Sequence, residues 1–265
     1  MSRLMKLVAL LLVAAAGPAV AQNATSSGTP YDVVIRNGRV LDGAGNPWIR
    51  ADVAIRDGRF VKIGLVPERG RTEIDATGKY VSPGWIDMMD HSGSVLLRNP
   101  LAENKLMMGV TTTIAGEGGT PVGATALPSY FRRLETQGIS INFGSYFSET
   151  QARTEVLGES ARAPDAAELL RMRAIMDSAM RAGALGMTTA LIYPPSSYAT
   201  TAELIDVGKA VARYGGIYAS HMRGEGKEVV QSVREAVAIG EQSGMPVEIF
   251  HLKVAYKPGW GILMD

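Results

Sequence analysis

The sequence predicts an α/β protein: an incomplete (β/α)8 barrel of the TIM type, preceded by a small β unit. The first observation is that residues 31–80 alternate apolar and polar side chains in short runs broken by turn-forming pairs. The second is that strand-like and helix-like segments alternate from residue 81 onward, and six strand ends recur about every 32 residues. A barrel of about 250 residues repeats about every 31 residues. We therefore assign residues 31–80 to the small β unit and residues 81–265 to about six units of an incomplete barrel.

The composition of the chain limits its chemistry. Its 265 residues are 46% hydrophobic and 20% charged, which is enough apolar material for a large core. The net charge of +1 gives no electrostatic reason to expect nucleic acid as a partner. Because the chain has no cysteine, disulfides, thiolate metal ligands and cysteine nucleophiles are excluded.

The N-terminus has the pattern of a secretory signal peptide. Arg3 and Lys6 precede an apolar run over residues 7–21 that ends in an A-x-A cleavage pattern. This run of 15 residues is shorter than the roughly 20 that a membrane anchor, the alternative, requires. We expect a signal peptide at 1–21, a flexible lead at 22–30, and a periplasmic or secreted mature protein without a membrane partner.

Three stretches predict the strands of the small β portion. They read DVVIRNGRVLDG, ADVAIRDGRFVKIG and TEIDATGKYV, with turns expected at Asn37-Gly38, Asp57-Gly58 and Gly78. Their close succession predicts an antiparallel unit. Three or four strands bury little apolar surface alone, so this unit must pack on something else.

The barrel portion is predicted from strand ends and capped helices. Its strands are expected to end near Met88, Ala115, Tyr146, Ala190, Ser220 and Phe250. Helices are expected over residues 166–182, 201–214 and 228–243. Asp165 and Thr200 stand at N-cap positions, and a glycine follows each helix. Because six units do not close an eight-stranded barrel, we expect this chain to be the N-terminal part of a longer protein.

All three histidines of the chain stand at predicted strand ends. His91 follows the first barrel strand, His221 the fifth and His251 the sixth. One such histidine is more often a structural residue, but three at the same rim are not expected by chance. Active sites of these barrels lie at the carboxyl ends of the strands, and neutral imidazole is the commonest metal ligand. The sequence therefore predicts a metal site at this rim.

A carboxylate accompanies the histidines. Glu117 follows the second strand in the glycine-rich stretch GVTTTIAGEGGTP, where a solvated loop glutamate is the alternative interpretation. Together with His221 and His251 it would form a three-ligand set with one open position, which is typical of catalytic zinc. Bound zinc lowers the pKa of a water molecule to about 7, so a nucleophile becomes available at neutral pH.

Six motifs carry a family resemblance. In order they are YDVVIRNGRVLDGAGNPWIRADVAIRDGRFVKIG, VSPGWIDM, GVTTTIAGEGG, IYPPSSYATTAEL, YASHMRGEG and HLKVAYKPGWG. This ordered set resembles the N-acyl-D-amino-acid deacylases (D-aminoacylases) of the metal-dependent amidohydrolase superfamily. The resemblance implies a metal-bearing barrel with a small flanking β-sandwich, of which residues 31–80 would be a portion. It further implies one or two zinc ions, a small N-acyl amino acid as substrate, and hydrolysis of its amide bond. It also implies a general-base aspartate on a later strand, beyond Asp265.

Two positions depart from the family pattern. The family closes its first strand with His-x-His, whereas this chain has Met89-Asp90-His91, and methionine is a poor zinc ligand beside imidazole. The family's bridging cysteine aligns near Gly118, directly after Glu117. We therefore expect one metal held by His221, His251 and Glu117. The first-strand site, with His91 and Asp90 as candidate ligands, is expected to be impaired.

The resemblance also implies residues that bind substrate. Tyr193, Arg223 and Lys253 match family positions for the carboxylate or amide of the substrate. A guanidinium pairs a carboxylate through two hydrogen bonds, and a phenol donates one. For Arg223 the alternative is a structural ion pair with Glu225, and Tyr193 could belong to a rigid loop and nothing more.

Three functions remain open at this point. The first is metal-dependent hydrolysis of linear N-acyl amides, probed by whether the pocket beyond Tyr193 admits an acyl chain. The second keeps the fold but takes a cyclic amide or a dipeptide. The third is a degenerate barrel that binds a ligand without turning it over, which Met89 favours. For this chain alone we expect little or no catalysis.

Overall fold

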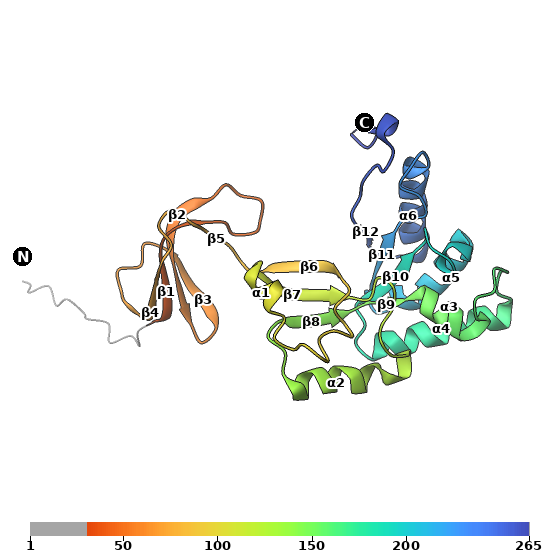
Figure 1. Cartoon of the computed structure of the whole chain (residues 1–265), viewed down its shortest axis with the longest axis horizontal. Coiled ribbons are helices and arrows are strands. Elements are labelled where there is room, and N and C mark those ends of the chain that lie inside the picture. The colour runs from red at the N-terminus through yellow and green to blue at the C-terminus, as the bar shows by residue number, and fades with distance from the viewer. Residues whose placement is uncertain (1–30, 265) are drawn as a thin grey trace, which may run out of the picture. The chain divides into compact units, whose positions relative to one another are not determined.

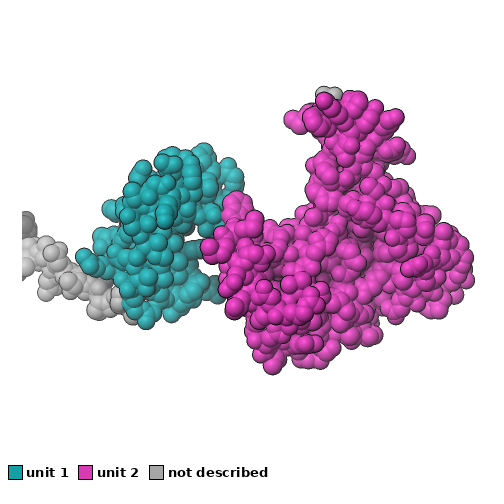
Figure 2. Space-filling view, in the orientation of Figure 1, with its two compact units in different colours: residues 1–83 teal, residues 84–265 magenta. Residues whose placement is uncertain are grey.

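A computed structural model describes residues 31–264 of the chain. The signal peptide expected at 1–21 and the lead expected at 22–30 lie outside the described residues. The chain divides into two compact units, one up to Pro83 and one from Gly84 (Figure 2). Between residues 31 and 264, no helix has both the length and the apolar character that crossing a bilayer requires.

The first unit is one five-stranded sheet. Its strands are β1 (Tyr31–Val40), β2 (Ile49–Arg56), β3 (Arg59–Gly64), β4 (Gly70–Asp75) and β5 (Tyr80–Val81). The order is β3-β2-β1-β4, and β5 also pairs with β1. Strands β1, β2 and β3 are antiparallel neighbours, but β4 and β5 both run parallel to β1. The prediction of an antiparallel unit is therefore wrong for two of the five strands.

The two predicted turn-forming pairs of this sheet behave differently. Asp57 and Gly58, with φ of 50° and 69°, form the tight hairpin turn between β2 and β3, as predicted. Asn37-Gly38 lies inside β1, where the pairing with β2 shifts register between Ile35 and Gly38. The predicted turn there is a β-bulge, because positive φ suits a bulge as well as a turn.

The second unit consists of parallel strands in chain order (Figure 1). One sheet holds β6 (Trp85–Asp90), β7 (Val110–Ala115) and β8 (Asn142–Ser145). The other holds β9 (Phe147–Ser148), β10 (Gly186–Ala190), β11 (Ile217–His221) and β12 (Val247–Ile249). All neighbours are parallel, and the strand positions predicted from the sequence are confirmed within a few residues.

The two sheets meet at Tyr146, which separates β8 from β9. The Tyr146 amide donates to the Ala115 carbonyl of β7 at 2.8 Å, and the Leu185 amide donates to the Ser145 carbonyl at 2.9 Å. The third predicted strand is thus present, but it is interrupted where it passes from one sheet to the other. The result is an open series of six parallel strand positions, in the order expected of barrel units.

Helices follow most of the strands. The α-helices are α1 (Glu103–Met107), α2 (Leu127–Gln137), α3 (Glu149–Leu157), α4 (Ala166–Arg181), α5 (Thr201–Ala212) and α6 (Val229–Ser243). Short 3-10 turns are η1 (Ala124–Ala126), η2 (Ser196–Tyr198) and η3 (Lys257–Gly259). Helix α4 packs between α3 and α5, and α5 packs on α6.

Local signals set the ends of these helices, and apolar side chains hold them on the strands. The Asp165 carboxylate accepts from the Glu168 amide in a reciprocal capping box, and the Thr200 hydroxyl accepts from the Glu203 amide. Both predicted N-caps are therefore confirmed. The main core lies between helices and sheets, and its fully buried members include Phe147, Met172, Met176, Met187, Leu204, Val207 and Ile239.

Candidate metal centre

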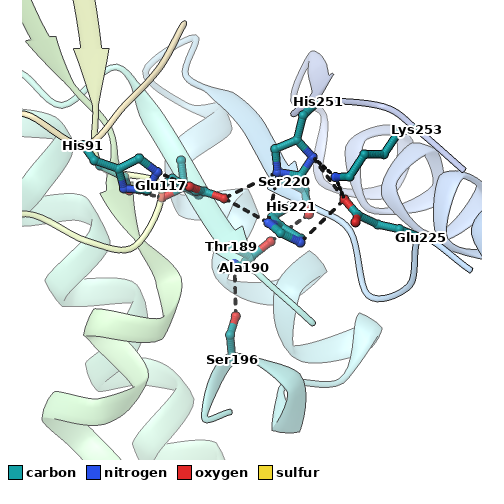
Figure 3. A network of polar contacts seen from close by, with 12 residues as sticks. His91, Glu117, Thr189, Ala190, Ser196, Ser220, His221, Glu225, His251 and Lys253 are labelled. Carbon is teal, nitrogen blue, oxygen red and sulfur yellow. Dashed lines mark hydrogen bonds and ion pairs between the residues drawn. The ribbon is translucent and has the colours of Figure 1, made fainter. Parts of the chain in front are cut away.

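Four strand ends deliver polar side chains to one place (Figure 3). His91 directly follows β6, and Glu117 stands two residues after β7. His221 is the last residue of β11, and His251 stands two residues after β12. Because the strands of each sheet are parallel and in chain order, their carboxyl ends lie along one rim. Residues separated by more than a hundred positions are thereby brought together.

Three ligand atoms converge at this rim. His221 Nδ1 lies 3.1 Å from Glu117 Oε1 and 3.1 Å from His251 Nε2. His251 Nε2 lies 3.9 Å from Glu117 Oε1. Ligands at about 2.0–2.1 Å from a tetrahedral zinc ion would stand roughly 3.4 Å from one another. The spacing of these three atoms therefore suits one small tetrahedral ion.

The chemistry of the three residues agrees with that spacing. Glu117 and His221 are each 7% exposed, and His251 is half-buried. A carboxylate oxygen and two imidazole nitrogens are acceptors when they carry no proton, so they repel one another unless a cation or a proton lies between them. Imidazole nitrogen and carboxylate oxygen are also standard zinc ligands. The residues therefore fit a zinc ion.

At Gly116, directly before Glu117, the backbone passes close to the Tyr146 carbonyl group. Gly116 has φ of 108°, and a β-carbon at this position would lie 2.6 Å from the Tyr146 carbonyl oxygen. Only glycine fits both constraints. The turn that it allows directs Glu117 toward the histidines. A cavity of about 280 Å³, with glycine-rich walls, lies beside Glu117 and His91.

Glu117 also reaches the first strand. Its second carboxylate oxygen, Oε2, lies 2.7 Å from His91 Nε2, whereas Oε1 faces the other two histidines. His91 is largely exposed, with 66% of its side chain accessible to solvent. One carboxylate therefore joins a buried pair of histidines to an exposed one.

Relatives of known activity share this sequence and fold. No family model matches the chain. It is 32% identical, over 258 residues, to D-aminoacylase of Alcaligenes xylosoxydans xylosoxydans, covering 89% of this chain and 53% of that protein. A solved structure of D-aminoacylase, described as defining a subset of amidohydrolases, matches with a TM-score of 0.78 at 32% identity, covering 88% of this chain and 54% of that one. The chain is a homologue of the N-acyl-D-amino-acid deacylases.

One further relative carries a metal. The N-acyl-D-glutamate deacylase of Bordetella bronchiseptica, solved with zinc and a phosphonate inhibitor, matches with a TM-score of 0.74 at 32% identity. That match covers 83% of this chain and 51% of the other. The chain thus spans about half the length of the deacylases that it matches.

The departures from the deacylase pattern on β6 have structural explanations. Asp90 is buried, and its carboxylate accepts from Lys105 Nζ at 2.6 Å and from the Ser92 amide at 3.0 Å. Burial raises the pKa of Asp90, but these hydrogen bonds outweigh it and hold the pKa below its usual value. The structure does not bring Asp90 into the ligand group. Met89 packs against the apolar cluster of Ile114, Tyr146, Ala219 and Phe250.

Two of the three residues expected to bind substrate, Tyr193 and Lys253, lie beside the candidate ligands. The Tyr193 ring stands edge-on to His221, with centroids 5.2 Å apart, and is 58% exposed beside the ligand group. Lys253 is half-exposed, and its ammonium contacts Glu225 and His251. Tyr193 and Lys253 therefore lie beside the candidate ligand group, and their role in substrate binding stays a prediction.

Arg223 is held by protein groups instead. Its guanidinium donates to both carboxylate oxygens of Glu235 on α6, at 2.9 Å, and to the carbonyls of Ser197 and Ala199. The alternative interpretation, a structural ion pair of Arg223, is confirmed, but its partner is Glu235 and not Glu225. Glu225 faces the histidines, and Arg223 pairs with Glu235, which lies further along the chain on α6.

Sequence reasoning missed Glu225 as a site residue. Glu225 is 9% exposed, and its Oε1 lies 3.1 Å from His251 Nδ1 and 3.7 Å from His221 Nε2 (Figure 3). The available signal was its place in the loop after β11, four residues beyond His221.

A second buried group at the strand ends was also missed. Glu149 directly follows β9 and is fully buried, and neither of its carboxylate oxygens has a hydrogen-bond partner in the described residues. Burial, followed by the charge of Glu203, raises its pKa well above the ordinary value of 4.5. Arg153 pairs with Glu203 and donates to the Arg162 carbonyl at 2.7 Å. This group contacts none of the ligand residues.

Proposed function

We infer that the protein is a zinc-dependent amidohydrolase that removes the acyl group from N-acyl-D-amino acids. The observation that carries this inference is the convergence of Glu117 Oε1, His221 Nδ1 and His251 Nε2, all within 4.8 Å of one another. Homology to D-aminoacylase and to two acidic N-acyl-D-amino-acid deacylases supports the substrate class.

The chain's own residues divide the work. His221, His251 and Glu117 would hold one ion, and His91, whose Nε2 lies 2.7 Å from Glu117 Oε2, would be the residue of the first strand available to help hold a second. When bound, zinc supplies a nucleophilic water at neutral pH and polarises the amide carbonyl. Lys253, half-exposed beside the ligands, would pair with the carboxylate of the substrate, and Tyr193 would border its acyl group. The family resemblance implies an aspartate as the general base.

Two further proposals accompany this function. The charged start, apolar run and cleavage pattern at 1–21 support export to the periplasm or beyond the cell. The strands β6–β12 would be units of a TIM-type (β/α)8 barrel, and the β1–β5 sheet would be a portion of a small β-sandwich. The proposed substrate is a small molecule, and the net charge of +1 gives no support for a nucleic-acid partner.

A degenerate, non-catalytic binding protein is the second candidate, because Met89 is packed in an apolar cluster and Asp90 is committed to Lys105. Metal analysis of the purified chain separates the two. For the zinc enzyme we expect about one equivalent of zinc, lost in His221→Ala and in His251→Ala. His91→Ala, which removes only a contact with Glu117 Oε2, should retain that equivalent.

Negligible zinc in the native chain would favour the binding protein. If zinc is present, matched D and L forms of N-acetyl amino acids, a cyclic amide and a dipeptide should be screened as substrates. Turnover of a cyclic amide or a dipeptide in place of N-acyl-D-amino acids would reassign the substrate class but keep the metal site.

A further inference from the structure

We propose that Glu225 is a positioning residue that fixes the tautomers of both histidines of the metal centre, a role that rests on the proposed zinc site. His221 and His251 each turn one ring nitrogen toward Glu117 and the other toward Glu225. His221 Nδ1 and His251 Nε2 face the ligand group, whereas His221 Nε2 and His251 Nδ1 face Glu225 Oε1 at 3.7 Å and 3.1 Å.

The tautomer of each ring follows from this arrangement. A neutral imidazole carries one N–H, so the nitrogen that binds metal must be the bare one and the opposite nitrogen must carry the proton. For His251 this places the proton on Nδ1, where Glu225 accepts it. For His221 it places the proton on Nε2, a buried atom with no hydrogen-bond partner in the described residues. Glu225 Oε1 is the acceptor toward which this nitrogen points.

Lys253 could favour the other tautomer of His251. Its Nζ lies 3.0 Å from His251 Nδ1 and also contacts Glu225 Oε1. If Lys253 donated to Nδ1, the ring proton would move to Nε2 and would face Glu117 in place of a metal ion. Glu225 prevents this, because it competes for Nδ1–H and attracts the ammonium. Lys253 in return compensates the charge of a carboxylate that is 9% exposed.

The backbone holds Glu225 between the two histidine loops. It lies in the Gly224-Glu225-Gly226 turn between β11, which ends at His221, and α6. Its carbonyl accepts from the Ala255 amide at 2.7 Å, so the segment that follows His251 is tied to it. Main chain and side chain of one residue thus link both metal-binding loops.

The test compares Glu225→Gln, Glu225→Asp and the control Glu228→Gln in the whole chain. Glu228 is exposed and lies three residues away, so the control makes the same charge change without touching a histidine. Zinc affinity is measured by chelator competition, and the imidazole tautomers by ¹⁵N NMR of labelled histidine. We expect Glu225→Gln to weaken zinc binding by about 10- to 100-fold, Glu225→Asp to recover part of that loss, and Glu228→Gln to match the native chain.

The NMR experiment needs no variant. In the zinc-loaded native chain we expect a protonated Nδ1 on His251 and a protonated Nε2 on His221, and the opposite tautomers would overturn the proposal even if Glu225→Gln failed to fold. Unchanged affinity and tautomers in a folded Glu225→Gln would remove the role of Glu225 but leave the zinc site intact. Absence of zinc binding by the native chain would remove both.

Discussion

Glu117 Oε1 lies 3.1 Å from His221 Nδ1, although 104 residues separate the two along the chain. The contact exists because β7 and β11 each run parallel to the neighbours in their own sheet, and both side chains lie at the carboxyl ends of their strands. The other oxygen of Glu117 is occupied by His91 at 2.7 Å. Among the described residues Glu117 is therefore the candidate ligand that contacts all three histidines, and the proposed metal site depends on its charge.

Glu117→Gln should abolish stable zinc binding. The amide keeps the shape of the side chain but removes the negative charge, and its NH2 group turns a donor toward the histidines. Loss of an outer partner costs about 10- to 100-fold in affinity, and loss of a direct ligand should cost more. Chelator competition measures the change. Glu103→Gln, at an exposed position on α1, is the control, and native-like affinity in Glu117→Gln would exclude Glu117 as a ligand.

Gly116→Ala should destabilise the protein and displace Glu117. The new methyl group would lie 2.6 Å from a carbonyl oxygen, and φ of 108° is costly for alanine. We expect a loss of about 1–3 kcal/mol in the free energy of unfolding, together with weaker zinc binding. Gly118→Ala is the matched control, since its β-carbon would meet nothing within 4 Å. Equal stabilities of the two variants in urea denaturation would contradict this account.

Strand and helix positions could be predicted because their signals are local. Asp165 and Thr200 each cap a helix by accepting from an amide three residues later. The strand β7, which is rich in β-branched residues, ends directly before Gly116. The histidines could be placed on one rim because parallel topology fixes where strand ends go. The turn predicted at Asn37-Gly38 was wrong because the same local backbone conformation occurs in hairpin turns and in β-bulges. Only the pairing of β1 with β2 distinguishes the two.

The partners of charged side chains could not be predicted in the same way. Asp90 meets Lys105 and Arg223 meets Glu235 through the folding of helices across the strand ends, and no spacing along the sequence encodes these pairs. Glu225 was considered only as a partner of Arg223. Its turn toward His221 and His251 depends on the β12 loop, which reaches it from a later part of the chain.

Arg223→Ala should lower stability more than it lowers zinc affinity. The guanidinium ties Glu235 of α6 to the carbonyls of the η2 segment, so its removal leaves a half-buried carboxylate without its cation. We expect a loss of about 1–3 kcal/mol, measured by urea denaturation. Arg234→Ala, an exposed neighbour on α6, should be nearly neutral. If Arg223→Ala were equally neutral in stability but weakened the binding of an N-acyl-D-amino acid, measured by calorimetry, the substrate-binding role would be restored.

Glu149→Gln should stabilise the protein at neutral pH. The native carboxyl is fully buried beside Glu203, and its oxygens lack hydrogen-bond partners among residues 31–264, so its ionised form is disfavoured in the fold. An amide of the same shape removes the cost of keeping an ionisable group there. We expect a gain of about 1–3 kcal/mol in the free energy of unfolding, measured by urea denaturation near pH 7. Glu155→Gln, an exposed residue of the same helix, is the control.

The pH dependence of that gain follows from the raised pKa of Glu149. In the unfolded chain this carboxyl ionises near 4.5, whereas in the folded chain it stays protonated to a higher pH. Between these two values the folded state holds a proton that the unfolded state has released, so native stability falls as the pH rises. The advantage of Glu149→Gln should therefore be small at about pH 4, grow as the pH rises, and level off once the folded-state carboxyl ionises. An advantage that shrinks with rising pH would mean that Glu149 is stabilised as a carboxylate, and the raised pKa would be wrong.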